Sequence, residues 1–323
     1  MLKSGYTMKR TPFISIIIPV YNAEKTLQKC FNSINNLNYS KQLFEVIIVD
    51  NNSTDKSKKI IQESPFRCLL QEKPGPAAAR NRGAEAANGR ILAFTDADAC
   101  VARDWLSKII CAYEQDSHID GIAGYSGGIN NNIWAEFYQR FQEAFYFKHL
   151  AEQKPPVKHI DTKNFSIKKD CFIDVGGFNE EYLRGEDTDL GYRLFSRGYR
   201  IKYVPEVRVD HINPTDLTHQ VRVFERHVKY SFRSFLSFDI KTQKVLCPHY
   251  LKSYHRIYYS DAFVVNKLLK PFLNVSTNMI ILALLGILHA GNNLKLKHCL
   301  YPIYFLCVRT SRFKGKLNAE IKR

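Results

Sequence analysis

The sequence has no C-x-x-C pair among its eight cysteines, and its acidic residues are few, 31 Asp and Glu against 47 Lys and Arg. Without that spacing a zinc or disulfide framework is disfavoured, and buried, reduced thiols are expected. The chain also lacks G-x-G-x-x-G after its first predicted strand and G-x-x-x-x-G-K-[ST] anywhere. These absences argue against a dinucleotide-binding dehydrogenase and a P-loop NTPase.

Long apolar runs are also missing, since none reaches the roughly 20 residues of a membrane-spanning helix. The most apolar stretch, residues 279–290, is short, and polar side chains interrupt the wider window 271–290. Residues 1–13 are basic and lack the apolar segment, about 7–15 residues long, of a secretory signal. Without a secretory signal, the protein is expected to stay on the cytoplasmic side. The apolar stretch near its C-terminus is expected to lie on a membrane surface and not to span the bilayer.

Hydrophobic residues make up 45% of the 323 residues and aromatic residues 13%, which is enough to form a core. The length fits two domains, or one large α/β domain with an extension. Residues 201–323 hold 20 Lys and Arg against 7 Asp and Glu, whereas residues 1–200 have a net charge of only +3. An anionic partner is therefore expected in the last third. A membrane surface fits better than nucleic acid, because no nucleic-acid recognition module is visible.

Apolar runs of strand length alternate with helical patterns in the first hundred residues. Strands are expected at 14–20, 44–49, 68–70 and 91–95, with helices at 24–35 and 76–88. The alternation predicts a Rossmann-like, mainly parallel sheet with helices on both faces, followed by a second, mixed half over 160–204. Pro19 should end the first strand, because proline cannot donate to a ladder. Residues 134–150 are predicted to form one aromatic helix.

Right-handed crossovers would bring the loops after these strands to one rim of the sheet, where open α/β sheets bind ligands. Asp96 and Asp98 follow the fourth strand, one residue apart. Two carboxylates in that arrangement can bind Mg²⁺ or Mn²⁺ together with diphosphate oxygens. The alternative is a polar turn that caps the next helix.

A second acidic feature lies at 185–194, where Glu186 and Asp187 begin a predicted helix. Acids in the first turn interact favourably with the helix dipole, which is sufficient to explain them. Such a carboxylate also has a fixed direction, so it could accept a proton from a substrate hydroxyl.

Five segments in order carry a family resemblance. They are ISIIIPVYNAEKTL (14–27), FEVIIVDNNSTD (44–55), GPAAARNRGAEAANGRILAFTDAD (75–98), GGFNE (176–180) and GEDTDLGYRL (185–194). In these segments, over about 14–211, the chain resembles the family 2 glycosyltransferases, which have the GT-A fold. The resemblance implies an inverting, metal-dependent enzyme that moves a sugar from a nucleotide-diphospho-sugar, by default a UDP-sugar. The acceptor would be a hydroxyl of a glycan or a lipid-linked intermediate.

The resemblance also implies roles for residues on the donor side. Those matching donor-binding positions are Pro19, Tyr21, Asp50, Asn51, Arg80 and Asp96. Tyr21 would stack on the base, and Asp96 would approach the ribose and diphosphate. Asn51 stands where many members have a second aspartate, and an amide can donate as well as accept hydrogen bonds.

The remaining matches concern the metal and the reaction. Asp98 would bind the cation, a divalent Mn²⁺ or Mg²⁺, and His211 would complete the metal site. Asp187 matches the catalytic base, and Glu186 would help orient the acceptor or donor. Without the resemblance, a lone histidine such as His211 is more often structural.

We expect a GT-A catalytic domain over 12–215 and a basic, helical, membrane-associated C-terminal region over 216–323. Within that region, 217–236 predicts a helix with a basic stripe beside its apolar side. Two alternatives remain open at this point: a nucleotidyltransferase acting on sugar phosphates, and a non-catalytic nucleotide-sugar-binding protein at the membrane. The first would need a glycine-rich, lysine-containing loop after the first strand, and the sequence lacks one there.

Overall fold

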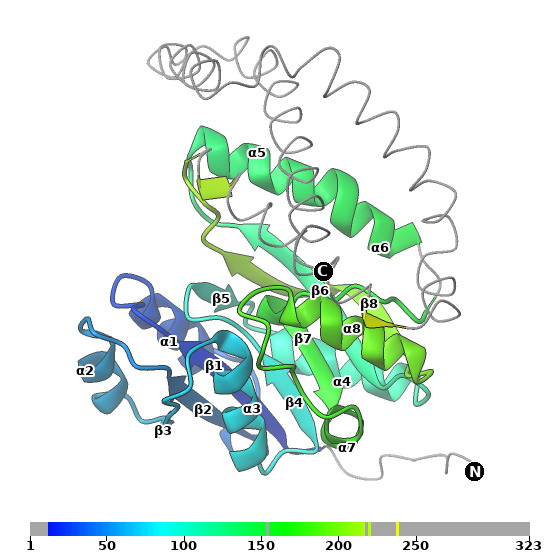
Figure 1. Ribbon diagram of the computed structural model, residues 1–323, viewed down its shortest axis with the longest axis horizontal. Helices are drawn as coiled ribbons and strands as arrows, with labels where there is room; N and C mark the ends of the chain where they lie inside the picture. Colours follow the sequence, from blue (N-terminus) through cyan, green and yellow to red (C-terminus); the bar gives the residue numbers. More distant parts are fainter. Residues whose placement is uncertain (1–11, 153–154, 217–218, 221–236, 239–323) are drawn as a thin grey trace. The chain divides into compact units, whose positions relative to one another are not determined.

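The computed structural model describes residues 12–152, 155–216, 219–220 and 237–238 (Figure 1). The chain divides into two compact units. The first, Met1–Asn131 with Gln142–Asn213, contains every candidate site residue. Most of helix α5 (Ile133–Gln142) belongs to the second.

Within the described residues, the first unit has one sheet of eight strands in the order β3-β2-β1-β4-β7-β6-β8-β5 (Figure 1). The strands are β1 Ile14–Val20, β2 Phe44–Asp50, β3 Arg67–Leu70, β4 Ile91–Phe94, β5 Ala99–Val101, β6 Gly121–Gly128, β7 Phe165–Lys168 and β8 Ile201–His211.

Strands β1 to β4 pair in parallel, with Val20 opposite Asp50 and Ile17 opposite Phe94. They are connected by α1 (Leu27–Asn35), α2 (Ser57–Gln62) and α3 (Pro76–Ala86), with the short 3-10 helix η1 (Lys41–Leu43) before β2. Because the strands are parallel, their carboxyl ends share one rim, as the alternation of the sequence predicts.

Helices cover both faces of the sheet. Alternate residues of β1 point to opposite faces, so Ile16 and Ile18 join one core cluster and Ile17 joins the other. Helices α1 and α4 (Trp105–Gln115) pack in the first cluster. Helices α3, α7 (Lys169–Asp174) and α8 (Glu186–Ser196) pack in the second. The expected Rossmann-like architecture, with helices on both faces of the sheet, is confirmed.

The second half of the sheet is mixed, as expected. Strand β7 is antiparallel to both β4 and β6, β6 is parallel to β8, and β5 is antiparallel to β8. The sequence pattern does not predict strand β6 (GIAGYSGG), because glycine is a poor strand former. A Cβ on Gly124 would collide with the Asn164 side chain and the Val207 carbonyl. Close packing therefore requires glycine in this strand.

Two sequence predictions about local structure are wrong. Pro19 does not end β1, which continues to Val20. The Val20 carbonyl accepts from Asn51 N on the β2 side, so the backbone of the preceding residue, Pro19, faces β4. The pairing of β1 with β4 already ends at Ile17, so the missing N–H of Pro19 costs no hydrogen bond between these strands. The expected single helix over 134–150 is interrupted by a π-helical turn, η2 (Glu143–Phe147), before α6 (Lys148–Glu152).

The five cysteines in the described residues are free thiols. Cys30 and Cys171 are buried, as expected, but Cys68 and Cys111 are exposed. Cys68 is exposed because it lies on β3, which is the edge strand of the sheet.

Most of the predicted helix over 217–236, and all of the apolar stretch 279–290, lie outside the described residues. In the part of the chain that the structure describes, no helix has both the length and the apolar character needed to cross a bilayer.

Candidate active site

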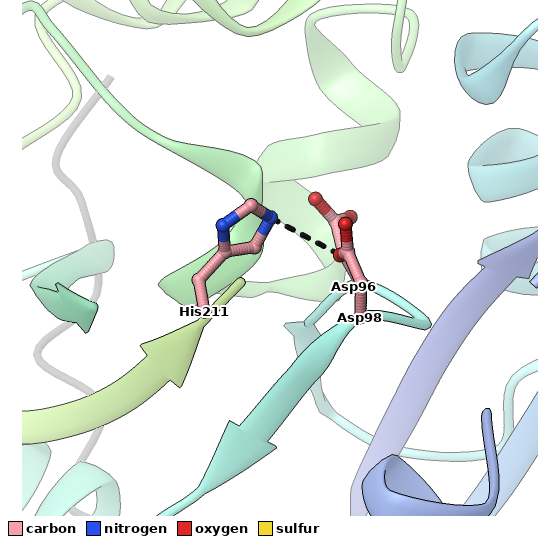
Figure 2. A group of neighbouring side chains, drawn as sticks. All are labelled: Asp96, Asp98 and His211. Atoms are coloured by element: carbon pink, nitrogen blue, oxygen red, sulfur yellow. Dashed lines mark ion pairs between the residues drawn. The ribbon is translucent and has the colours of Figure 1, made fainter. Parts of the chain in front are cut away.

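Three potential metal ligands meet where β4, β5 and β8 come together. Asp96 and Asp98 lie in the loop between β4 and β5, and His211 is the last residue of β8. The register pairs Ala99 with His211, which brings the imidazole beside the carboxylate that precedes Ala99. His211 Nε2 lies 3.1 Å from Asp98 Oδ1, and one ligand atom from each of the three residues lies within 4.8 Å of the others. Figure 2 shows the three side chains pointing toward one another.

These residues suit a hard divalent cation. Two carboxylates and one imidazole are a common ligand set for Mn²⁺. Arg80 donates a hydrogen bond to one carboxylate oxygen of Asp96, so the other oxygen is available to bind a cation. The pKa of Asp96 is lowered, because Arg80 and His211 together outweigh the opposing effect of burial. Asp96 is therefore ionised at neutral pH, as a metal ligand must be.

Arg80 connects the metal ligands to the second acidic feature. Its guanidinium is buried in α3 and donates through Nη2 to Asp96 Oδ1 at 2.7 Å and through Nη1 to Glu186 Oε1 at 2.8 Å. Its Cζ also lies 5.7 Å from the centre of the Phe178 ring. Both terminal nitrogens thus bind carboxylates, so Arg80 joins the β4–β5 loop to the start of α8.

Helix α8 begins at the predicted acids. Its N-cap, Gly185, has φ +77°, a left-handed conformation that glycine adopts at little cost. Glu186 is buried, and Asp187 is half-buried. Asp187 accepts from its neighbour Thr188 N at 2.6 Å and has no ion-pair partner among the described residues. Glu186 is therefore paired with a cation, Arg80, whereas Asp187 has no such partner in the described part of the chain.

Burial raises the pKa of Asp187 to about 6, and the nearby negative charge of Asp161 adds to this effect. The Thr188 N–H, Arg80 and Lys163 oppose it. A carboxylate with a pKa near neutrality is a better proton acceptor than an ordinary one.

On the donor side, Tyr21 directly follows β1, and Asp50 is the last residue of β2, where it pairs with Val20 at the end of β1. Tyr21 is 64% exposed, which leaves its ring open to stacking. Asp50 is buried and accepts from Ser53 N at 3.1 Å. The loops after β1 and β2 are joined by hydrogen bonds, including Asn22 N to Ser53 Oγ at 3.1 Å. These residues therefore lie on the rim that the sequence predicts.

The Asn51 side chain has a structural task. Its Nδ2 donates to the carbonyls of Gln71 and Lys73, each at 2.7 Å, and its Oδ1 accepts from Gly75 N at 2.7 Å. An aspartate could make only the last of these bonds. Asn51 therefore fastens the segment that leads from β3 into α3, the helix that carries Arg80.

Replacing Asn51 with Asp should reduce stability by about 2 kcal/mol, because two donated hydrogen bonds are lost and a carboxylate then faces two carbonyl oxygens. Urea unfolding would measure the change. Asn52→Asp is the matched control, since the exposed Asn52 makes one such bond, to the Glu72 carbonyl. Equal stability of the Asn51→Asp variant and wild type would contradict this role.

The sequence interpretation missed Asp161 and Lys163. They form an ion pair at the 3-10 helix η3 (Thr162–Asn164), in which Asp161 is the N-cap and Lys163 the middle residue, and both side chains are largely buried. Lys163 lowers the pKa of both Asp96 and Asp187, so its ammonium influences both acidic features. No motif marks this pair, and only the tertiary structure brings its charges close enough to influence both acidic features.

Known proteins resemble this chain in sequence. Glycosyltransferase AglE of Haloferax volcanii is 31% identical over 204 residues, covering 61% of this chain and 66% of that protein. A Methanococcus voltae protein is 26% identical over 215 residues, covering 60% of this chain and 65% of its own length. Its name is dolichyl N-acetyl-alpha-D-glucosaminyl phosphate 3-beta-D-2,3-diacetamido-2,3-dideoxy-beta-D-glucuronosyltransferase. The matches thus span just under two thirds of each relative.

Among solved structures, the mannosyltransferase PcManGT from Pyrobaculum calidifontis, in complex with GDP-Man and Mn²⁺, has a similar fold. The TM-score is 0.61 at 20% identity, over 97% of this chain and 87% of that chain. Residues 15–176 match the family model described as Glycosyl transferase family 2. That match covers half of the sequence, and it includes β1, β2, β4 and the Asp96–Asp98 loop. The chain therefore belongs to glycosyl transferase family 2.

Proposed function

We propose that this protein is an inverting glycosyltransferase that moves a sugar from a nucleotide-diphospho-sugar to a hydroxyl of a glycan or lipid-linked acceptor. The observation that carries the proposal is the chain of contacts from His211 and Asp98 through Asp96 and Arg80 to Glu186, beside Asp187. This arrangement supports the proposal, because a cation on Asp96, Asp98 and His211 would bind the diphosphate, and Asp187 would take the proton.

In this proposal each residue has one task. Asp96, Asp98 and His211 hold Mn²⁺ or Mg²⁺, which when bound stabilises the charge on the departing diphosphate. Tyr21 stacks on the base and Pro19 and Asp50 line the nucleoside pocket, while Asn51 and Arg80 hold the surrounding segments. A UDP-sugar is the favoured donor, and a GDP-sugar is the first alternative to test.

Asp187 acts as the base. Its carboxylate takes the proton of the acceptor hydroxyl as that oxygen attacks the anomeric carbon. The bond between the anomeric carbon and the diphosphate oxygen breaks on the opposite face, so the configuration inverts and the nucleoside diphosphate leaves with the bonding electrons. Glu186, held by Arg80, keeps the start of α8 in place.

The direct test is a thermal-shift screen of UDP, GDP, dTDP, CDP and ADP with and without Mn²⁺. One nucleoside diphosphate should stabilise the protein by about 2.7 kcal/mol at a concentration 100 times its Kd. The effect should need Mn²⁺ and should be lost in Asp98→Asn. Stabilisation by GDP alone would mean that the donor is a GDP-sugar and not a UDP-sugar. If none of the five nucleoside diphosphates stabilised the protein, the proposal would be refuted.

Activity should rise with pH through about 6 and then level off, because Asp187 must lose its proton before it can act. A pH profile of kcat/KM would show this limb for the free enzyme. Asp161→Asn should move the limb to lower pH, since Asp161 raises the pKa of Asp187. An unchanged limb in that variant would show that another group controls the rate.

The basic region, 216–323, is proposed to bind an anionic membrane surface, and the protein to act at the cytoplasmic face. The proposal rests on the charge of the last third of the sequence. Sedimentation with vesicles of phosphatidylcholine, with and without phosphatidylglycerol, would test it. Binding only to the anionic vesicles, and lost at high salt, is expected.

A further inference from the structure

Strand β8, which ends at the candidate metal ligand His211, is interrupted by a bulge. Its pairing with β6 is regular up to Val204, but the next residue of β6 pairs with Arg208, so the register skips residues 205–207. From Arg208 to His211 the pairing is regular again. A bulge bends a strand and changes the direction of the side chains that follow it. The position of His211 therefore depends on these three extra residues.

The bulge changes the face of the sheet to which the side chains of β8 point. Before it, Ile201 belongs to the core cluster that includes α3 and α8; after it, Val207 and Val209 belong to the cluster that includes α1 and α4. Alternate residues of a regular strand point to one face, so these odd-numbered residues would all share a face without the bulge. An odd number of extra residues reverses the alternation. His211 therefore points to the same face as Ala99, its buried partner in β5.

Without the bulge, another residue of β8 would take the place of His211. If the register of the first part of β8 continued, Arg208 would lie opposite Gly128, the last residue of β6. That place is also opposite Ala99, directly after Asp98. A guanidinium there would pair with the Asp98 carboxylate and compete with a metal ion. The bulge thus decides whether a metal ligand or a positive charge lies beside Asp98.

The buried side chain of Asn164, the last residue of η3, holds the bulge. Its Nδ2 donates to the carbonyl of Val207, the last skipped residue, and to the carbonyl of Tyr125 in β6, each at 2.8 Å. Its Oδ1 accepts from Trp105 Nε1 at 2.9 Å. Asn164 is only 1% exposed, so these two carbonyls are bound by its amide at a place that is closed to bulk water.

The hydrogen bonds at this place require an amide. An NH₂ group has two N–H donors, one for each carbonyl, and the amide oxygen accepts from the indole. An aspartate could accept from the indole but would face both carbonyls with a negative charge. Gly124 in β6 leaves the necessary space, because a Cβ there would lie 2.3 Å from Asn164 Nδ2 and 2.5 Å from the Val207 oxygen. The bulge therefore depends on both Asn164 and Gly124.

We infer that Asn164 is a positioning residue for the metal site: by holding the bulge in β8, it fixes the register that brings His211 beside Asp98. The inference rests on the proposed cation site at Asp96, Asp98 and His211, and it adds a residue from outside that site. When Asn164 no longer holds the bulge, the site keeps its two carboxylates and loses its imidazole.

The test is Asn164→Asp, which keeps the size of the side chain and the acceptor for Trp105 but removes both donated bonds. Mn²⁺ alone would be titrated into the full chain, and electron paramagnetic resonance would measure the free ion. Pulsed measurements on the bound ion would detect the nitrogen of a coordinating imidazole. Wild type should show this nitrogen signal, and the variant should lose it and bind Mn²⁺ about tenfold more weakly.

A second variant, Gly124→Ala, disturbs the same contact without adding a charge. It should also lose the nitrogen signal, and it tests the inference if Asn164→Asp does not fold. Ile61→Ala is the control for stability, because Ile61 is buried in α2, between β2 and β3 in the chain. The cavity should lower its Tm, while the nitrogen signal and the Mn²⁺ affinity stay as in wild type.

A double variant shows whether Asn164 acts through His211. His211→Ala alone should lose the nitrogen signal and weaken Mn²⁺ binding. Adding Asn164→Asp should weaken binding little further, because residues that act through one another have non-additive effects.

The inference would be overturned if Asn164→Asp and Gly124→Ala both kept the nitrogen signal and the Mn²⁺ affinity of wild type. Fully additive losses in the double variant would also overturn it, since Asn164 would then act by another route. A wild type that binds no Mn²⁺ would instead refute the proposed cation site, and the inference would fall with it.

Discussion

Asp187→Asn should lower kcat by roughly 10²–10⁴, which is the usual contribution of a general base. The amide has nearly the same shape as the carboxylate but cannot take a proton from the acceptor hydroxyl. Because Asp187 makes no ion pair in the described structure, the fold loses little, and donor affinity should stay close to that of wild type. Steady-state rates and calorimetric titration of the nucleoside diphosphate would measure the two effects separately.

The matched control is Asp189→Asn, in the same turn of α8. Asp189 is buried and pairs with Arg193 at 2.7 Å, so its loss should reduce stability while the turnover of the folded enzyme persists. If Asp187→Asn retained the wild-type kcat, Asp187 would not be the base. If Asp189→Asn lost turnover without losing stability, the roles of the two acids would have to be exchanged.

Arg80→Met should be the most destabilising single change in the site. Removing one partner of a buried ion pair typically costs about 3–5 kcal/mol, because the remaining charge is left uncompensated. Here two carboxylates, Asp96 and Glu186, would lose their shared cation at once. The pKa values of the Asp96 and Glu186 carboxyl groups should both rise, so the variant should also bind Mn²⁺ poorly at neutral pH.

Urea unfolding and Mn²⁺-dependent stabilisation by the nucleoside diphosphate would measure these effects. Arg82→Met serves as the control, since Arg82 lies on the same helix, is about half exposed and, among the described residues, forms an ion pair with Glu85. Surface pairs of this kind contribute about 0–1 kcal/mol. If Arg80→Met and Arg82→Met lost similar amounts of stability, the burial of Arg80 and its two ion pairs would not contribute more than a surface pair.

Local pattern was a reliable guide to the strands of the first half. Strand β1 covers the predicted range 14–20, although Pro19 does not end it, and β2 and β4 end within one residue of their predicted ranges, since each is a short apolar run followed by a polar loop. Strand β6 was not predicted, because the reason for its glycines is the close approach of Asn164, some 40 residues later in the chain.

By itself, the sequence determined which acids are available, where the parallel strands lie and which loops share their rim, because periodicity and turn chemistry are properties of neighbouring residues. The task of each polar side chain was decided only by the tertiary structure. Asn51 fastens the segment before α3, and Arg80 joins Asp96 to Glu186. Each of these hydrogen bonds joins residues that are distant in the chain, and only folding brings the two partners together.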